Sequence, residues 1–117
     1  MYYSNYMFDF LSPKVPQVEA TVVKKAIDTK EDISIIDVRT PQEFSKGNIP
    51  GSINIPVEQI EKVESIFTDK SKRIYVYCLS GSRSVYAVSS MMKLEYSNVL
   101  DMKSGLLAWR SSGYPLT

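Results

Sequence analysis

Runs of apolar residues alternate with amphipathic segments along this chain, and the alternation predicts its secondary structure. Residues 33–38 and 74–77 are mostly β-branched or aromatic, which is typical of strands covered on both faces. Shorter segments at residues 52–56 and 98–102 predict two further strands. Apolar positions recur with helical spacing elsewhere, which predicts helices over residues 20–28, 40–47, 57–67 and 84–94, and a final helical turn over 105–109.

Strands that alternate with helices are typical of an α/β fold. Strand–helix–strand units connect by right-handed crossovers, so we expect a parallel sheet with helices on both faces. One helix has a clear start signal, with Thr40 as its cap and Glu43 three residues later. Ligand sites in parallel sheets lie outside the carboxyl ends of the strands. Asp37 and Cys78 both stand at such ends, which makes them candidate site residues.

Composition narrows the classes of function. A chain of 117 residues with 44% hydrophobic residues fits one domain with its own core. Its formal net charge of +1 gives no bias towards nucleic acid or a membrane surface. No segment approaches the ~20 apolar residues of a membrane span, and the N-terminus lacks the pattern of a signal peptide. A single cysteine cannot form an internal disulfide, so we expect a cytoplasmic protein.

The chain contains no histidine, which limits its possible chemistry. Metal sites built on histidine and Cys–His nucleophile–base pairs are excluded, and we expect neither a metal nor a cofactor. The first eleven residues hold five aromatic residues, and a proline-containing segment follows. We expect residues 1–14 to form an arm on the surface of the domain formed by residues 15–117. A dimer contact or a partner-binding arm is the alternative.

Cys78 is followed by a segment with the composition of an anion-binding loop, residues Leu79, Ser80, Gly81, Ser82 and Arg83. A thiol between a strand and a helix faces backbone N–H groups and the positive end of the helix dipole, which stabilise the reactive thiolate. Gly81 permits a backbone that turns N–H groups inward, and the two serines add hydroxyl donors. Arg83 either faces the site or ties the loop to a carboxylate. The alternative is a buried, inert cysteine, but such a residue needs no cradle of donors.

The spacing between the cysteine and the arginine distinguishes two possible reactions, phosphoryl transfer and sulfur transfer. Cysteine-based phosphatases place five residues between them, whereas only four separate Cys78 from Arg83, and Ser84 stands where a phosphatase has its arginine. The shorter cradle favours a sulfur atom carried on the cysteine over a phosphoryl group.

Four blocks of the chain resemble the single-domain rhodanese family of sulfurtransferases, and the likeness spans residues 15–117. The blocks are Ile36 to Phe44, Gly47 to Pro56, Cys78 to Ser84, and Ser104 to Trp109 with Gly113 to Pro115. The resemblance implies a rhodanese-like α/β domain with about five parallel strands and helices on both faces. It also implies that Cys78 takes a sulfane sulfur from a small anionic donor such as thiosulfate, or from a persulfide. The cysteine then carries it as a persulfide to a thiol, to cyanide or to an acceptor protein.

The family resemblance also assigns roles around the cysteine. The active-site loop corresponds to residues 78–83, and Asp37 and Arg39 correspond to a pair that braces or borders the pocket. Asp37 as a general acid or base is the alternative, but a partner for Arg39 or Arg83 is the more common role of such a residue. Glu43 is expected to be a capping and ion-pair residue.

Three positions depart from the family pattern. Asn48 replaces a frequent histidine, and we expect it to bridge a turn by hydrogen bonding. Ser104 replaces a glycine and is expected to reshape the pocket wall slightly. Leu79 stands where members that use thiosulfate often have a basic residue, which favours a persulfide as the natural donor. A non-catalytic rhodanese-like module that binds a protein partner is the alternative function, although such modules commonly lack the cysteine.

Overall fold

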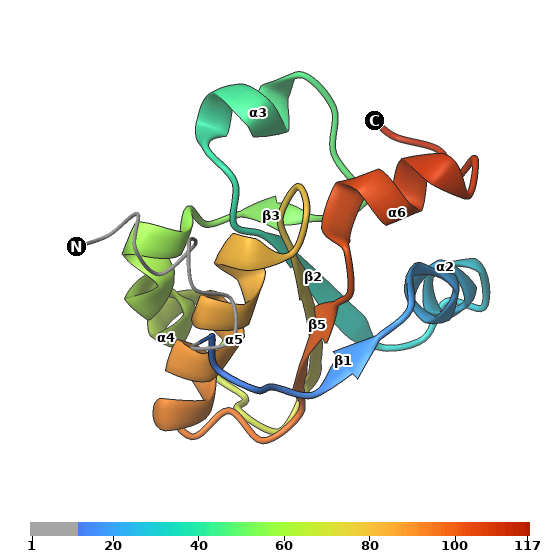
Figure 1. The fold of residues 1–117 in the computed structure, drawn as a ribbon. Coiled ribbons are helices and arrows are strands. Elements are labelled where there is room, and N and C mark those ends of the chain that lie inside the picture. Colours follow the sequence, from blue (N-terminus) through green and yellow to red (C-terminus); the bar gives the residue numbers. More distant parts are fainter. Residues whose placement is uncertain (1–11) are drawn as a thin grey trace.

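The computed structural model describes residues 12–117 of the chain (Figure 1). The expected N-terminal arm, residues 1–14, lies outside the described residues except for its last three. Within residues 12–117, no helix is long and apolar enough to cross a membrane.

Five parallel strands form one sheet at the centre of the molecule, which confirms the predicted α/β architecture. The spatial order is β1-β5-β4-β2-β3, so the chain crosses over repeatedly and the sheet centre is built from β5, β4 and β2. The strands are β1 (Gln17–Val18), β2 (Ile33–Asp37), β3 (Ile53–Asn54), β4 (Arg73–Tyr77) and β5 (Val99–Met102).

Helices cover both faces of the sheet (Figure 1). Helix α2 (Ala20–Asp28) and helix α6 (Gly105–Ser111) pack together on one face. The other face is covered by α5 (Ser82–Lys93), the 3₁₀ helix η2 (Val57–Lys62) and α4 (Val63–Ile66). The short helix α3 (Pro41–Ser45) follows β2 and stands beyond the carboxyl edge of the sheet.

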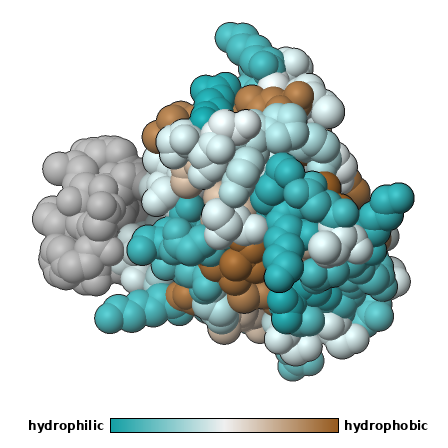
Figure 2. Space-filling model, turned by 90° about the vertical axis from the view of Figure 1, so that its right-hand side faces the viewer, coloured by the Kyte–Doolittle hydropathy of each residue, from teal (hydrophilic) through white to brown (hydrophobic). Residues whose placement is uncertain are grey.

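Alternation along β4 decides which face the cysteine occupies. Ile74, Val76 and Cys78 belong to the core cluster under α5, whereas Tyr75 and Tyr77 belong to the cluster under α2 and α6. Successive side chains of a strand point to opposite faces, so an even-numbered cysteine at the end of β4 must face α5. Hydrophobic residues on the face viewed in Figure 2 form separate patches within a mainly hydrophilic surface.

The segment predicted as one helix over residues 57–67 differs in detail. It is a 3₁₀ helix followed by a short α-helix, with a non-helical φ of −118° at Gln59. The apolar residues Val57, Ile60 and Val63 are spaced three apart, which matches the three residues per turn of a 3₁₀ helix. The two-residue strand β1 is not predicted by the pattern, because two residues show no period.

Candidate active site

Cys78 lies at the carboxyl end of β4 with its side chain fully buried (0% exposed). The N–H of Gly81 donates to its sulfur at 3.1 Å, and the N–H of Ser84 donates at 3.4 Å. The thiol in turn donates to Ser84 Oγ at 3.4 Å. Gly81 reaches this position with φ of +108°, a left-handed conformation that glycine adopts without a Cβ clash. The loop therefore wraps around the sulfur and directs N–H groups at it.

Helix α6 fixes the peptide planes of the loop. The N–H groups of Leu106 and Leu107 donate to the carbonyls of Cys78 and Leu79 at 2.9 and 3.0 Å. The carbonyl and N–H of one trans peptide point in opposite directions. The N–H groups of Leu79 and Ser80 therefore point away from α6, and no acceptor for them is found in residues 12–117. They are donors available to a bound anion.

Gly105 makes this close approach of α6 possible. A Cβ built at Gly105 would lie 2.3 Å from the Cys78 carbonyl oxygen and 2.7 Å from that of Leu79. The preceding Ser104 has φ of +62°, which an L-residue adopts at a cost of about 1–2 kcal/mol. The Ser-Gly pair thus forms the turn that seats α6 on the loop.

The remaining loop residues have different surroundings. Leu79 is half-buried and packs against the core cluster under α2 and α6, so its side chain contributes apolar contact. Ser80 is exposed, and Ser82 begins α5, whose first-turn N–H groups lack partners within the helix. Arg83 forms a two-point ion pair with Glu43 of α3, with N···O distances of 2.8 and 3.1 Å.

Asp37 and Arg39 form a buried ion pair beside the loop. The Arg39 Nη2 lies 2.7 Å from an Asp37 carboxylate oxygen and also donates to the Gly47 carbonyl at 2.7 Å. Burial lowers the pKa of Arg39, but hydrogen bonding and attraction to Asp37 outweigh it, and the net pKa is raised. The guanidinium also lies over the Tyr77 ring. This pair ties the end of β2 to the turn after α3, and within residues 12–117 it makes no hydrogen bond with Cys78.

Asn48 bridges a turn, as its side chain was expected to do. Its Nδ2 donates to the Phe44 carbonyl at 3.1 Å, and its Oδ1 accepts from Ser52 and Thr117 hydroxyls at 3.3 and 3.0 Å. Backbone hydrogen bonds in both directions also join Asn48 to Thr117. Asparagine therefore serves here as a structural link to the C-terminal residue.

Glu43 combines the two roles expected of it. With Thr40 it forms a capping box at the start of α3, and it holds Arg83. The hydrogen bond from Arg83 is the largest cause that lowers the pKa of Glu43 to about 2, against the opposing effect of burial. One carboxylate thus connects α3 to the first turn of α5, next to the cysteine loop.

The substitution Glu43→Gln should remove an acid-sensitive contribution to stability. The folded pKa lies below the unfolded value, so the contribution is complete above pH ~4.5 and is lost as pH falls towards ~2. Because the side chain is 31% exposed, we expect a loss of only about 1 kcal/mol at pH 7. Urea unfolding at pH 7 and pH 3 measures it, and the variant should lose less stability between them than the wild type. Glu64→Gln, in an exposed pair with Lys70, is the control and should change stability by less than about 0.5 kcal/mol.

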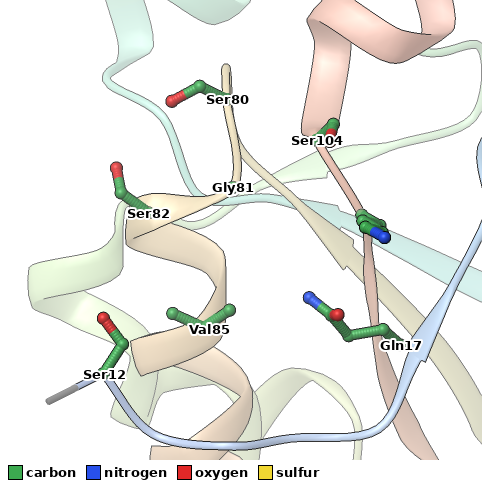
Figure 3. Close-up of a pocket in the computed structure, with 8 residues that line it drawn as sticks. Ser12, Gln17, Ser80, Gly81, Ser82, Val85 and Ser104 are labelled. Atoms are coloured by element: carbon green, nitrogen blue, oxygen red, sulfur yellow. The ribbon is translucent and has the colours of Figure 1, made fainter. Parts of the chain in front are cut away.

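A pocket of about 340 Å³ adjoins the outer side of the loop (Figure 3). In Figure 3 the Gln17 side chain extends from β1 towards Val85 of α5. Cys78 is not part of the wall, because the loop covers it. Most residues of the lining are of polar type, and the lining consists of Ser12, Gln17, Ser80, Gly81, Ser82, Val85, Lys103 and Ser104.

Two buried polar residues near the cysteine were not singled out from the sequence as contributors to the site. Ser84 contacts the sulfur through both its N–H and its hydroxyl. Asp101 is fully buried in β5 and accepts a hydrogen bond from Gln17. The spacing of Ser84, on the first helical turn after the loop, was a usable signal. Asp101 gave none, because its surroundings come from strands distant in sequence.

Comparison with known proteins agrees with this architecture. The model of the rhodanese-like domain family matches residues 19–112. A sulfurtransferase from Allochromatium vinosum is 29% identical over 102 residues, which cover 87% of this chain and 94% of that protein. Thiosulfate sulfurtransferase 16, chloroplastic, from Arabidopsis thaliana is 36% identical over 92 residues, covering 68% of this chain and 76% of the relative.

A solved structure shares the fold. The crystal structure of a thiosulfate sulfurtransferase from Pseudomonas aeruginosa superposes with a TM-score of 0.82 at 25% identity. The match covers 88% of this chain, which corresponds to 20% of that longer one. The chain belongs to the rhodanese-like domain family.

Proposed function

We propose that the chain is a sulfurtransferase in which Cys78 carries a sulfane sulfur as a persulfide. The observation that supports this most directly is the pair of N–H groups, from Gly81 and Ser84, that donate to the Cys78 sulfur. Backbone donors aimed at sulfur stabilise an anionic thiolate or persulfide, and a cysteine that only filled the core would not need them.

The proposed reaction has two steps, each a displacement at sulfur. The Cys78 thiolate attacks the outer sulfur of thiosulfate, the S–S bond of the donor breaks, and sulfite leaves with the electron pair. A nucleophilic thiolate or cyanide then attacks the outer sulfur of the cysteine persulfide, which releases the product and regenerates the thiolate. A persulfide donor would react in the same way and release its thiolate.

The proposed roles of the other residues follow from their contacts. Residues 79–83 form the donor-binding loop, in which the N–H groups of Leu79 and Ser80, which have no acceptor in residues 12–117, receive the anion. Asp37 and Arg39 support the loop by bracing the neighbouring strand end. Leu79 adds no positive charge, which favours a persulfide as the natural donor with thiosulfate as a substitute.

The fully buried sulfur is the observation that favours the alternative, a non-catalytic protein-binding module. Intact mass after brief thiosulfate treatment separates the two. We expect one added sulfur atom (about 32 Da) that dithiothreitol removes, because persulfides are reducible. Protein alkylated at Cys78 beforehand is the control and should gain nothing. If protein that has not been alkylated gains no sulfur from thiosulfate or from a low-molecular-weight persulfide, the binding module is the better explanation.

We also propose a cytoplasmic location, because a single cysteine suits a reducing compartment. We further propose that residues 15–117 form the catalytic domain and that residues 1–14 form an N-terminal arm.

A further inference from the structure

Asp101 is a buried carboxyl group that the proposed reaction does not use. It is 0% exposed, and its Oδ2 accepts a hydrogen bond from Gln17 Nε2 at 2.7 Å. Its Oδ1 accepts none from residues 12–117. Burial raises the pKa of Asp101, and the opposing effects of Ser84 and Gln17 are smaller. A carboxyl group in this environment can hold a proton at a pH where exposed ones are ionised.

Strand pairing places Asp101 on the same side of the sheet as the cysteine. Asp101 pairs with Val76 in the parallel register of β4 and β5, and Cys78 lies two residues beyond Val76 on the same face. Helix α5 covers that face, and its first turn carries the fully buried Ser84. Ser84 Oγ lies 3.4 Å from the Cys78 sulfur, and the same hydroxyl is one of the two groups that favour ionised Asp101.

No cation offsets the charge of Asp101 among the described residues. The neighbouring strand β1 presents the neutral Gln17, and β4 presents Cys78 on this face. The basic residues of the adjoining segments are Lys14 before β1, Arg73 in β4, Arg83 and Lys93 in α5, and Lys103 after β5. None of them forms an ion pair with Asp101 in residues 12–117, and Arg83 pairs with Glu43 instead. The Ser84 hydroxyl is therefore the neighbouring group whose hydrogen bonding we expect to depend on the charge of Asp101.

On the basis of the proposed function, we propose that Asp101 is a positioning residue that controls the hydrogen bond which the Ser84 hydroxyl donates to the Cys78 sulfur when that sulfur is ionised. The hydroxyl has one proton to donate. It donates to the Gly81 carbonyl at a long 3.5 Å, and two further acceptors compete for it: the buried Asp101 Oδ1, which has no hydrogen-bond partner in residues 12–117, and the sulfur once that is ionised. Ionised Asp101 competes for this proton. Neutral Asp101 instead has its own O–H to donate to Ser84, which leaves the Ser84 proton for the anionic sulfur.

The two acids are therefore coupled through one hydroxyl. Ionisation of Asp101 opposes ionisation of Cys78, and a proton on Asp101 favours an anionic thiolate or persulfide. The reactivity of the cysteine towards an alkylating reagent should therefore depend on whether the Asp101 carboxyl group holds a proton.

The test is the pH dependence of Cys78 alkylation by iodoacetamide, which requires no sulfur transfer. The substitution Asp101→Asn keeps the shape, still accepts from Gln17, and donates to Ser84 at every pH. We expect the rise in alkylation rate to move to lower pH, with a rate about 3- to 10-fold higher at neutral pH. In a Ser84→Ala background the same substitution should have no such effect.

The outcomes separate this role from a structural one. A purely structural Asp101 would change the melting temperature of the variant and leave the pH profile in place, which would overturn the inference. A shift caused by Asp101→Asn that persists without the Ser84 hydroxyl would overturn the route through Ser84. If wild-type Cys78 is not alkylated at any pH, the reactive thiol of the proposed function fails, and this inference fails with it.

A second variant keeps the test usable should Asp101→Asn not fold. Gln17 lies on the exposed edge strand and is the hydrogen-bond donor to Asp101 Oδ2. Gln17→Leu removes that donor, so Asp101 should stay neutral to higher pH. The rise in alkylation rate should again move to lower pH, with a rate about 2- to 3-fold higher at neutral pH. An unchanged profile in Gln17→Leu would also count against the inference.

Discussion

Replacing Cys78 by serine should reduce sulfur transfer from thiosulfate to cyanide or dithiothreitol to background, a loss of roughly 100-fold or more. An oxygen atom at this position is not ionised at neutral pH and cannot carry a sulfane sulfur as a persulfide. The side chains of cysteine and serine differ little in volume, so the chain should still fold. Thiocyanate formation measures the activity, and circular dichroism with urea unfolding measures the fold.

Cys78→Ala is the companion variant, because it removes the sulfur without burying a new hydroxyl group. Both variants should be equally inactive even if their stabilities differ. Residual activity above about a tenth of wild type in either one would show that the sulfur is carried elsewhere, since a tenfold loss corresponds to only about 1.4 kcal/mol of transition-state stabilisation.

Gly105→Ala should have the largest effect on stability. The new Cβ would lie 2.3 Å from the Cys78 carbonyl oxygen, and the obstacle is backbone rather than a flexible side chain. Helix α6 would have to move away, which breaks the hydrogen bonds to the Cys78 and Leu79 carbonyls and lets the loop peptides rotate. We expect a loss of about 3 kcal/mol or more in the free energy of unfolding, together with loss of sulfur loading at Cys78.

Gly113 and Gly51 provide matched controls. They have φ of +75° and +83°, but a Cβ at either would meet no atom within 4 Å. Gly113→Ala and Gly51→Ala should therefore cost only the backbone strain, about 1–2 kcal/mol, and retain sulfur loading. Equal destabilisation in all three variants would mean that strain alone, and not contact with the loop, explains the glycine at position 105.

The parts of the fold that could be predicted are those that depend on residues close together in the sequence. Residues 33–37 and 73–77 are mostly apolar because both faces of these strands are covered, and the cap at Thr40 needs only its neighbours in sequence. Strand β1 could not be predicted, because it consists of Gln17 and Val18 and exists through pairing with β5, 84 residues further along the chain.

The same distinction holds at the site. The loop from Cys78 to Arg83 was visible because its donors are contiguous in sequence. The direction of Leu79, the partner of Arg83 and the position of Asp101 depend on how β5, α3 and α6 pack against that loop. Such contacts join residues far apart in the chain, as the 40 positions between Glu43 and Arg83 illustrate, and no local pattern encodes them.

Because α6 donates hydrogen bonds to the cysteine loop, the stability of this helix is coupled to ligand binding at the site. A ligand that binds the loop in this arrangement also holds the carbonyls to which Leu106 and Leu107 donate, so it makes α6 harder to unfold. Linkage is reciprocal, so a molecule that binds and holds α6 must tighten ligand binding at the loop by the same factor.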